Sequence, residues 1–171
     1  GDLDILISGE TTFGGITHAI SKIYRNNNGI NFTEQSAISL SGLLNCSSAW
    51  GDYDNDGRMD IVVTAMGDRP FLLHNRDTSD HHWLILDLEG TKSNRDAVGA
   101  QVYVEAGGRR YRQSVHVSQG FLCASSRRLH FGLGTAKEAT RITIRWPDGQ
   151  REEFTGVALD ARYRVQQGTG K

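Results

Sequence analysis

Residues 52–60 read Asp-Tyr-Asp-Asn-Asp-Gly-Arg-Met-Asp, and no other stretch constrains the fold of this chain as strongly. Carboxylates recur at alternate positions, on Asp52, Asp54 and Asp56, and return at Asp60. Calcium takes six to eight oxygen ligands at about 2.3–2.6 Å, and a tightly curled loop supplies them from alternate residues. The alternative is an ion-free surface turn rich in Asp, Asn and Gly. Four neighbouring carboxylates repel one another without a cation, so the stretch predicts a calcium loop.

Positions within the loop agree with this prediction but exclude an EF-hand. Gly57 is the sixth residue, where the chain turns sharply and a Cβ would be in the way. An EF-hand needs glutamate at its twelfth position, and here that residue is Val63. Residues 61–63 are β-branched, which indicates a buried strand rather than an exiting helix. We therefore expect the calcium ligands to be Asp52, Asp54, Asp56, the backbone carbonyl of Arg58, and Asp60.

The first part of the chain contains an internal repeat. Residues 1–7 align with residues 57–63, and residues 24–26 align with residues 73–75. The first copy is longer and carries a polar, glycine-rich stretch at residues 11–15, which we expect to be a loop. Its Asn-Asn-Asn-Gly sequence, at positions 26–29, predicts a hairpin between Ile23-Tyr24 and Phe32-Thr33. A repeat at this spacing is typical of propeller blades and similar arrays.

From about Asp77 the repeat stops, and alternating apolar and polar residues take over. Period-two alternation predicts strands with one buried face, here at residues 84–88, 100–104, 115–117 and 142–146. Gly107-Gly108 and Pro147-Asp148-Gly149 predict tight turns between such strands. We expect two domains, residues 1–77 and 78–171, with the second a small antiparallel β-sandwich or jelly roll. Its expected core includes Val102, Val104, Ile142, Ile144 and Trp146.

The calcium loop, the aliphatic strand after it and the Tyr-Arg-Asn-Asn…Phe-Thr pattern of residues 24–33 resemble the FG-GAP/VCBS repeats. That resemblance implies a propeller-type blade in which the calcium loop joins two strands. It also implies the five ligands at positions 52, 54, 56, 58 and 60. About one and a third repeats are present, because Asp2 and Asp4 match the end of a preceding loop. Such an array is rarely stable alone.

Three motifs in the second part resemble the ASPIC/UnbV domain over residues 81–168. They are Asn-Arg-Asp-Ala-Val-Gly-Ala at 94–100, His-Phe-Gly-Leu-Gly at 130–134 and Trp-Pro-Asp-Gly at 146–149. This domain often follows FG-GAP/VCBS repeats in secreted proteins. The resemblance therefore implies an all-β chain, with a partial propeller-type repeat followed by a small sandwich. It supplies no catalytic residue.

Composition excludes some partners and leaves others open. A formal net charge of −1 and a pI of about 6.6 give no electrostatic argument for nucleic acid. No apolar run approaches the ~20 residues that span a bilayer. A weak calcium site is filled by the high calcium concentration outside cells, so we expect a secreted or cell-surface protein.

Other candidate sites are weaker. Asp80, His81 and His82 together suit a transition metal, but neighbouring residues on a strand point to opposite faces, which favours a polar domain junction. Serines 118, 125 and 126 lie near His116 and His130 in sequence, but no Gly-x-Ser-x-Gly elbow accompanies them. We therefore expect no enzyme.

Two arginine clusters have two interpretations. They lie beside Tyr111 and Phe121 and suit an acidic glycan through charge and stacking. A solvated sheet face is the favoured alternative, because arginine is ordinarily exposed. The clustered residues are Arg109, Arg110, Arg112, Arg127 and Arg128.

Cysteines, glycosylation sequons and tryptophans leave further questions open. Cys46 and Cys123 form either one disulfide or two buried thiols. Asn31 and Asn45 begin glycosylation sequons. We expect the three tryptophans, Trp50, Trp83 and Trp146, to be core residues.

These patterns together predict a non-enzymatic, calcium-binding extracellular module that mediates adhesion or assembly with a protein or glycan partner. Residues 5–7 form an apolar strand, and we expect this N-terminal edge to self-associate or to need a neighbouring segment that completes it. The alternative is that the strand pairs within its own chain, beside residues 61–65, and its edge stays solvated. The alternative function is a carbohydrate-binding or accessory domain of a secreted polysaccharide-active protein.

Overall fold

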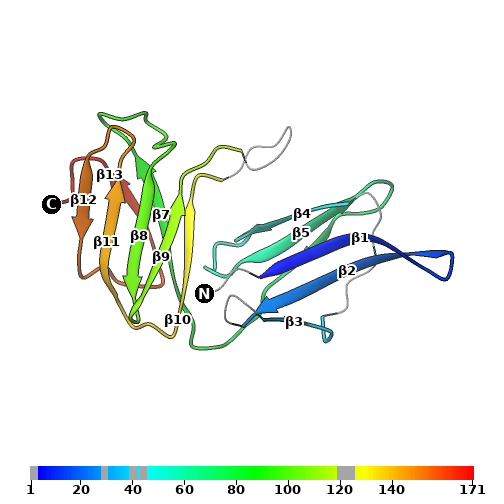
Figure 1. Ribbon diagram of the computed structural model, residues 1–171. Coiled ribbons are helices and arrows are strands. Elements are labelled where there is room, and N and C mark those ends of the chain that lie inside the picture. The colour runs from blue at the N-terminus through cyan, green and yellow to red at the C-terminus, as the bar shows by residue number, and fades with distance from the viewer. Residues whose placement is uncertain (1–3, 28–30, 39–41, 43–45, 119–125) are drawn as a thin grey trace. The chain divides into compact units, whose positions relative to one another are not determined.

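The computed structural model describes residues 4–27, 31–38, 42, 46–118 and 126–171. Across these residues the secondary structure is all β, without a helix (Figure 1). None of them belongs to a helix that is long and apolar enough to cross a membrane. The chain divides into two compact units, residues 1–77 and 78–171.

The first unit consists of two three-stranded antiparallel sheets, ordered β1-β2-β3 and β4-β5-β6. The expected hairpin is confirmed, because Tyr24 pairs with Glu34 and Asn26 pairs with Phe32. Residues 28–30 of its turn lie outside the described residues. The strands are β1 (Ile5–Phe13), β2 (Ile16–Asn26), β3 (Phe32–Glu34), β4 (Cys46–Gly51), β5 (Asp60–Ala65) and β6 (Phe71–Leu73).

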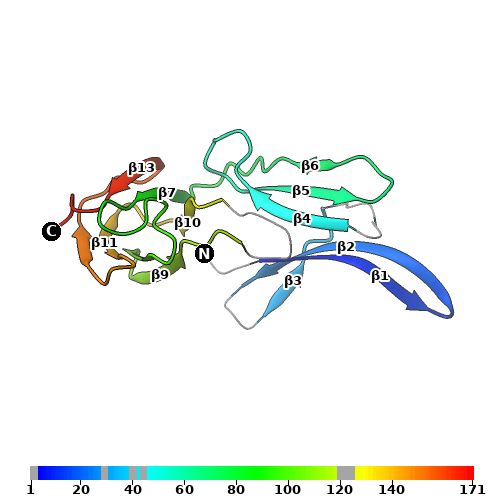
Figure 2. The same cartoon turned by 90° about the horizontal axis from the view of Figure 1, so that it is seen from above.

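Residues 11–15 do not form the expected loop. β1 pairs with β2 without interruption as far as Phe13 and Ile16, so the polar residues extend the two strands. Gly14 and Gly15 make the turn with φ of 59° and 79°, a left-handed pair that glycine adopts without strain. Figure 2 shows this hairpin extending past β3. Its tip is solvated, with the Phe13 side chain 83% exposed.

The core of the first unit is small. Among the described residues, only Ile23, Ile61 and Val63 form its buried cluster. The strand expected at residues 61–63 is confirmed, although Val62 points to solvent and the strand is buried on one face only. Trp50 was expected in the core but is 43% exposed. It lies near the end of β4, an edge strand of its sheet.

The second unit is a β-sandwich, as expected, with one sheet ordered β10-β7-β13 and the other β12-β11-β8-β9. One strand pair departs from the antiparallel expectation, because β13 runs parallel to β7. The chain crosses from one sheet to the other between β12 and β13, which lets β13 enter alongside β7 in the same direction. Residues 115–117 form no strand. The strands are β7 (His82–Glu89), β8 (Gln101–Ala106), β9 (Arg109–Ser114), β10 (Leu129–Gly134), β11 (Ala139–Arg145), β12 (Arg151–Phe154) and β13 (Ala161–Gln166).

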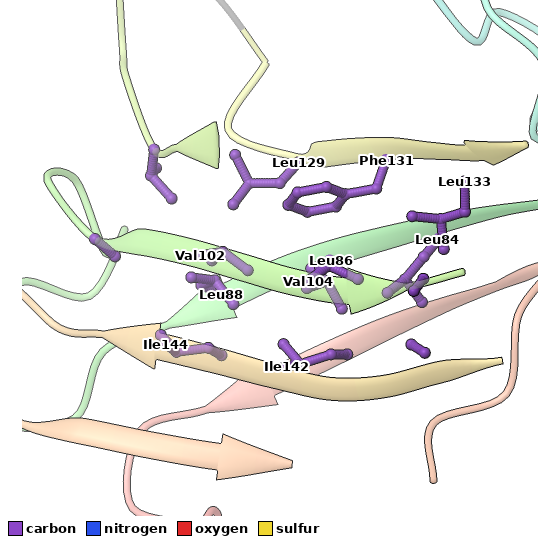
Figure 3. Packing of buried hydrophobic residues seen from close by; sticks show 14 of the residues in the cluster. Leu84, Leu86, Leu88, Val102, Val104, Leu129, Phe131, Leu133, Ile142 and Ile144 are labelled. Atoms are coloured by element: carbon purple, nitrogen blue, oxygen red, sulfur yellow. The ribbon is translucent and has the colours of Figure 1, made fainter. Parts of the chain in front are cut away.

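Alternation along the strands builds the core of this sandwich. Figure 3 shows the leucines of β7 packed between the apolar side chains of β8, β10 and β11. The five expected core residues are buried, with at most 2% of any side chain exposed. The expected turns are also present. Gly107-Gly108 joins β8 to β9 at positive φ, and the Gly149 N–H donates to the Trp146 carbonyl at 2.9 Å.

Candidate metal centre

The predicted calcium loop connects β4 to β5, two adjacent antiparallel strands. Asn55 and Gly57 take positive φ values of 60° and 85°, which lets the chain curl tightly between the two antiparallel strands. Glycine and asparagine are the residues that adopt this left-handed conformation most readily. The sequence therefore selects a tight curl at this point of the chain.

Hydrogen bonds from the backbone hold the loop around Asp52. Its Oδ1 accepts from the Asp56 N–H at 3.1 Å, and its Oδ2 accepts from the Gly57 N–H at 3.1 Å. The Asp56 N–H also approaches Oδ1 of Asp54 at 3.3 Å. A carboxylate oxygen has two lone pairs, so each of these oxygens retains one for a cation.

Asp60 is the most buried acidic residue of the site, with 1% of its surface exposed. Oδ2 accepts from the Tyr53 N–H at 3.0 Å, and Oδ1 accepts from the Asn75 N–H at 2.7 Å. The Asn75 side chain in turn donates to the Met59 carbonyl at 3.2 Å. A buried charge needs such partners. Asp60 therefore ties the loop to the segment that follows β6.

Three of the predicted ligands converge. Oxygen atoms of Asp52, Asp54 and Asp60 all lie within 4.8 Å of one another. Two oxygens that each bind calcium at about 2.3–2.6 Å can be separated by up to about 5 Å, so one ion can contact all three carboxylates. A set of carboxylate oxygens suits a hard cation such as calcium or magnesium. The residues present therefore fit a divalent cation.

Asp56 lies in an adjoining acidic group that shares Asp54 and includes His74. The Asp56 Oδ1 accepts from the Arg58 N–H at 2.8 Å, and its Oδ2 pairs with the Arg58 guanidinium. Burial raises the pKa of Asp56, but the Arg58 hydrogen bond and charge outweigh burial, so this pKa lies below its ordinary value. Asp56 is therefore ionised at neutral pH. The Arg58 carbonyl as a ligand stays a prediction.

His74 was not expected at this site. Its Nε2 lies 2.9 Å from Oδ2 of Asp54 and 3.8 Å from Oδ2 of Asp56. Its ring meets the Tyr53 ring edge-to-face, with centroids 6.0 Å apart. His74 follows β6 and reaches the loop only through sheet pairing, so no local sequence pattern marked it.

The repeat in the sequence did mark Asn75. In the first copy the Asn26 N–H donates to Oδ1 of Asp4 at 2.8 Å. The aligned Asn75 N–H donates to Oδ1 of Asp60 at 2.7 Å. The aligned residues therefore make the same contact in both copies, a hydrogen bond from the asparagine N–H to the carboxylate of the aligned aspartate.

Among the residues that the structure describes, the other candidates do not converge on a common site. His82 Nδ1 pairs with Oδ2 of Asp160 at 2.6 Å, whereas His81 Nδ1 lies 2.9 Å from the Ser79 hydroxyl. The His130 ring stacks on Trp83 with centroids 6.1 Å apart. Trp83 is thus partly exposed on an outer sheet face rather than in the core.

Four residues that the predictions involve lie outside the described residues: Asn45, Phe121, Cys123 and Ser125. A disulfide between the two cysteines and glycosylation therefore stay predictions. Among the basic residues, Arg127 pairs with Asp96. The Arg128 N–H donates to the Ser126 hydroxyl at 3.3 Å.

Comparison with protein families agrees with this architecture. A model of the FG-GAP-like repeat matches residues 1–63, which contain the acidic loop and β1–β5 up to Val63. A model of the ASPIC and UnbV family matches residues 90–171, most of the sandwich. The two matches occur in the expected order. No curated protein matches the chain at a significant level.

Proposed function

We propose that this chain, an FG-GAP-like repeat followed by an ASPIC and UnbV domain, is a non-enzymatic, calcium-stabilised extracellular module that mediates adhesion or assembly. One observation carries the proposal. The carboxylates of Asp52, Asp54 and Asp60 converge in a loop that the backbone holds curled, and Asp60 is buried. Converging carboxylates repel one another, and the cost is largest for the buried Asp60, so the cluster is costly without a cation.

Calcium would be held by Asp52, Asp54 and Asp60, with Asp56 and the Arg58 carbonyl as the further predicted ligands. A bound ion supplies positive charge that offsets carboxylate repulsion. An ion that binds only the folded state stabilises it by RT ln(1 + [L]/Kd), about 2.7 kcal/mol at a hundredfold excess over Kd. The small buried core of this unit makes such a contribution important.

An extracellular location follows from the supply of calcium. Extracellular modules fill sites with Kd values of about 10⁻⁴–10⁻³ M, which cytosolic calcium does not reach. FG-GAP-like repeat proteins are also often extracellular. Secretion or display at the cell surface therefore suits this loop.

The assembly role is supported by strand β1. Within the described part of the first unit, β1 pairs with β2 on one side, and its other side has no strand partner. Ile5 and Ile7 on this edge are 39% and 45% exposed. A long edge strand with exposed apolar residues is a template for strand addition. A second copy of this chain is the partner that we propose.

Isothermal titration of the 171-residue chain, cleared of metal, tests the calcium site. We expect one bound calcium, and an Asp52→Asn variant with affinity reduced at least about tenfold, because a ligand charge is lost. Asp68→Asn is the matched control, since Asp68 is exposed in the same unit and outside the loop. The absence of calcium binding by the native chain at millimolar calcium would refute the site.

Sedimentation velocity in calcium tests the proposed assembly. We expect the native chain to associate as concentration rises, and an Ile5→Lys/Ile7→Lys variant to stay monomeric, because edge lysines block strand pairing. Val117→Lys is the control, since Val117 is 49% exposed in the second unit. A native chain that stays monomeric at high concentration contradicts self-association and leaves the calcium site untouched.

A further inference from the structure

The outer face of the sheet β12-β11-β8-β9 gathers arginine side chains from three strands. Residues paired directly across antiparallel strands share a face. Arg110 and Arg141 both pair with Glu105, and Arg112 pairs with Tyr103. We call this surface the arginine face. Its residues are Arg110, Arg112, Arg141, Arg145 and Arg151, around a central Tyr103.

Positive charge on this face exceeds what its carboxylates neutralise. Arg141 lies 4.0 Å from Glu105, and Arg151 lies 3.3 Å from Glu153. The other three arginines have no carboxylate within salt-bridge distance among the described residues, and all five are exposed. The formal charge of the whole chain is −1, so this surplus is a local concentration.

Two of the arginines oppose each other directly. Arg145 on β11 pairs with Arg151 on β12, so their Cα atoms lie on neighbouring strands about 5 Å apart. Like charges directly opposite on a sheet are destabilising. An anion between the two guanidinium groups removes that repulsion, and guanidinium groups bind oxyanions through paired N–H donors.

Tyr103 orders two more arginines. The Arg110 guanidinium lies 4.3 Å from the ring centroid and that of Arg112 lies 5.9 Å from it. The Tyr103 hydroxyl donates to Oε1 of Gln101 at 3.0 Å, which fixes the ring. Stacking on the ring restrains the guanidinium groups, so less side-chain entropy is lost when they bind a ligand. The Arg110 guanidinium already stacks on this ring.

We propose that the arginine face binds a linear polysaccharide that carries carboxylate or sulfate groups. Such a polymer presents repeated oxyanions to a flat surface, and binding through guanidinium donors needs no aromatic platform. A single-stranded nucleic acid is less well matched, because single strands combine phosphate contacts with bases stacked on aromatic rings. The inference names a partner for the proposed adhesion function and rests on it only for access to extracellular polymers.

Binding of labelled heparin and hyaluronan to the full 171-residue chain tests the proposal. Heparin carries both groups and hyaluronan only carboxylates, so the two probes separate the sources of charge. Neutral dextran and a thymidine 20-mer are the controls for the polymer. Measurements in EDTA and in calcium separate this face from the calcium site, since no residue of the face belongs to the acidic loop.

An Arg112→Gln/Arg145→Gln variant should weaken binding about tenfold, because each exposed charge contact contributes a factor of up to about five. Arg162→Gln/Arg164→Gln is the matched control. It removes the same charge from the other sheet, where Arg162 and Arg164 already pair with carboxylates at 2.7 and 2.9 Å.

The outcomes are distinct. Binding of either acidic polysaccharide, salt-sensitive and weakened by the first variant alone, supports the proposal whether or not calcium is required elsewhere. Three results overturn it: no binding of heparin or hyaluronan at low salt, equal loss in both variants, or equal or tighter binding of the thymidine 20-mer. Arg112→Lys/Arg145→Lys keeps the charge and should retain part of the affinity, which distinguishes lost charge from a damaged fold.

Discussion

Replacing Asp54 with asparagine should change the stability of the first unit in opposite directions with and without calcium. Oxygens of Asp52 and Asp60 lie within 4.8 Å of an oxygen of Asp54. Two unit charges at that distance repel by about 1 kcal/mol at the dielectric constant of water. The introduced asparagine keeps a carbonyl oxygen that can accept from the Asp56 N–H, and it loses the contact between the carboxylate and Nε2 of His74, worth up to about 1 kcal/mol.

The magnitudes differ between the two conditions. Without calcium, relief from two repulsions less the lost histidine contact leaves the variant about 1 kcal/mol more stable. With calcium at a hundredfold excess over the native Kd, the native protein gains about 2.7 kcal/mol. A variant with tenfold to hundredfold weaker binding gains only about 0.4–1.4 kcal/mol. The order of stability therefore reverses, with the variant below the native protein by up to about 1 kcal/mol.

Hydrogen exchange of peptides that cover β5 reports this unit separately from the sandwich. The native chain, Asp54→Asn and the control Asp68→Asn are compared in EDTA and in calcium. The control should follow the native chain within about 0.5 kcal/mol in both conditions. An Asp54→Asn variant that is less stable than the native chain in both conditions, or more stable in both, would refute the coupling of acidic repulsion to calcium binding.

Three further predictions concern the sandwich. Gln167→Ala should lower the free energy of unfolding of the sandwich by about 3 kcal/mol. The reason is that the buried Oε1 of Gln167 accepts hydrogen bonds from the backbone N–H groups of residues 91–93. A melting temperature equal to the native value would contradict this. The hydrogen bond from the Gln150 N–H lowers the pKa of Asp148 below 3.8, with a further contribution from the Gln167 side chain. Its stabilising contribution is therefore full above about pH 4 and is lost as pH falls through the folded-state pKa, and Asp148→Asn should flatten acid unfolding followed by circular dichroism. Gly170→Ala should reduce stability by more than about 1 kcal/mol, because its Cβ would lie 2.8 Å from Cβ of Glu152; unchanged urea unfolding would argue against that crowding.

The sandwich core was predictable because it depends on a local pattern. Apolar residues alternate with polar ones along β8 and along residues 141–145 of β11, which places Val102, Val104, Ile142 and Ile144 on one face, and all four are buried. The partner of each strand was not predictable in the same way. Nothing in the alternation of β13 indicates that it lies parallel to β7, because pairing depends on where the chain crosses between sheets.

Glycine was the main source of error in the first unit. Gly14-Gly15 suggested a loop, but the same pair makes a two-residue hairpin turn that lets β1 and β2 continue. The acidic site was better defined, because ligand spacing is a local property of one loop. Three predicted carboxylates converge, whereas His74 comes from the segment after β6 and left no local signal.

The two units depend on different sources of stability, which separates the two proposed activities. The buried cluster of the sandwich draws on both of its sheets, whereas the described residues of the first unit include only three buried apolar side chains. A unit with so little buried apolar surface is sensitive to any ligand of its folded state. Calcium would therefore control the β1 edge, which exists only when the first unit is folded. The arginine face lies on the sandwich, which contains none of the residues of the acidic loop, so we expect polysaccharide binding to persist where calcium is low and assembly not to.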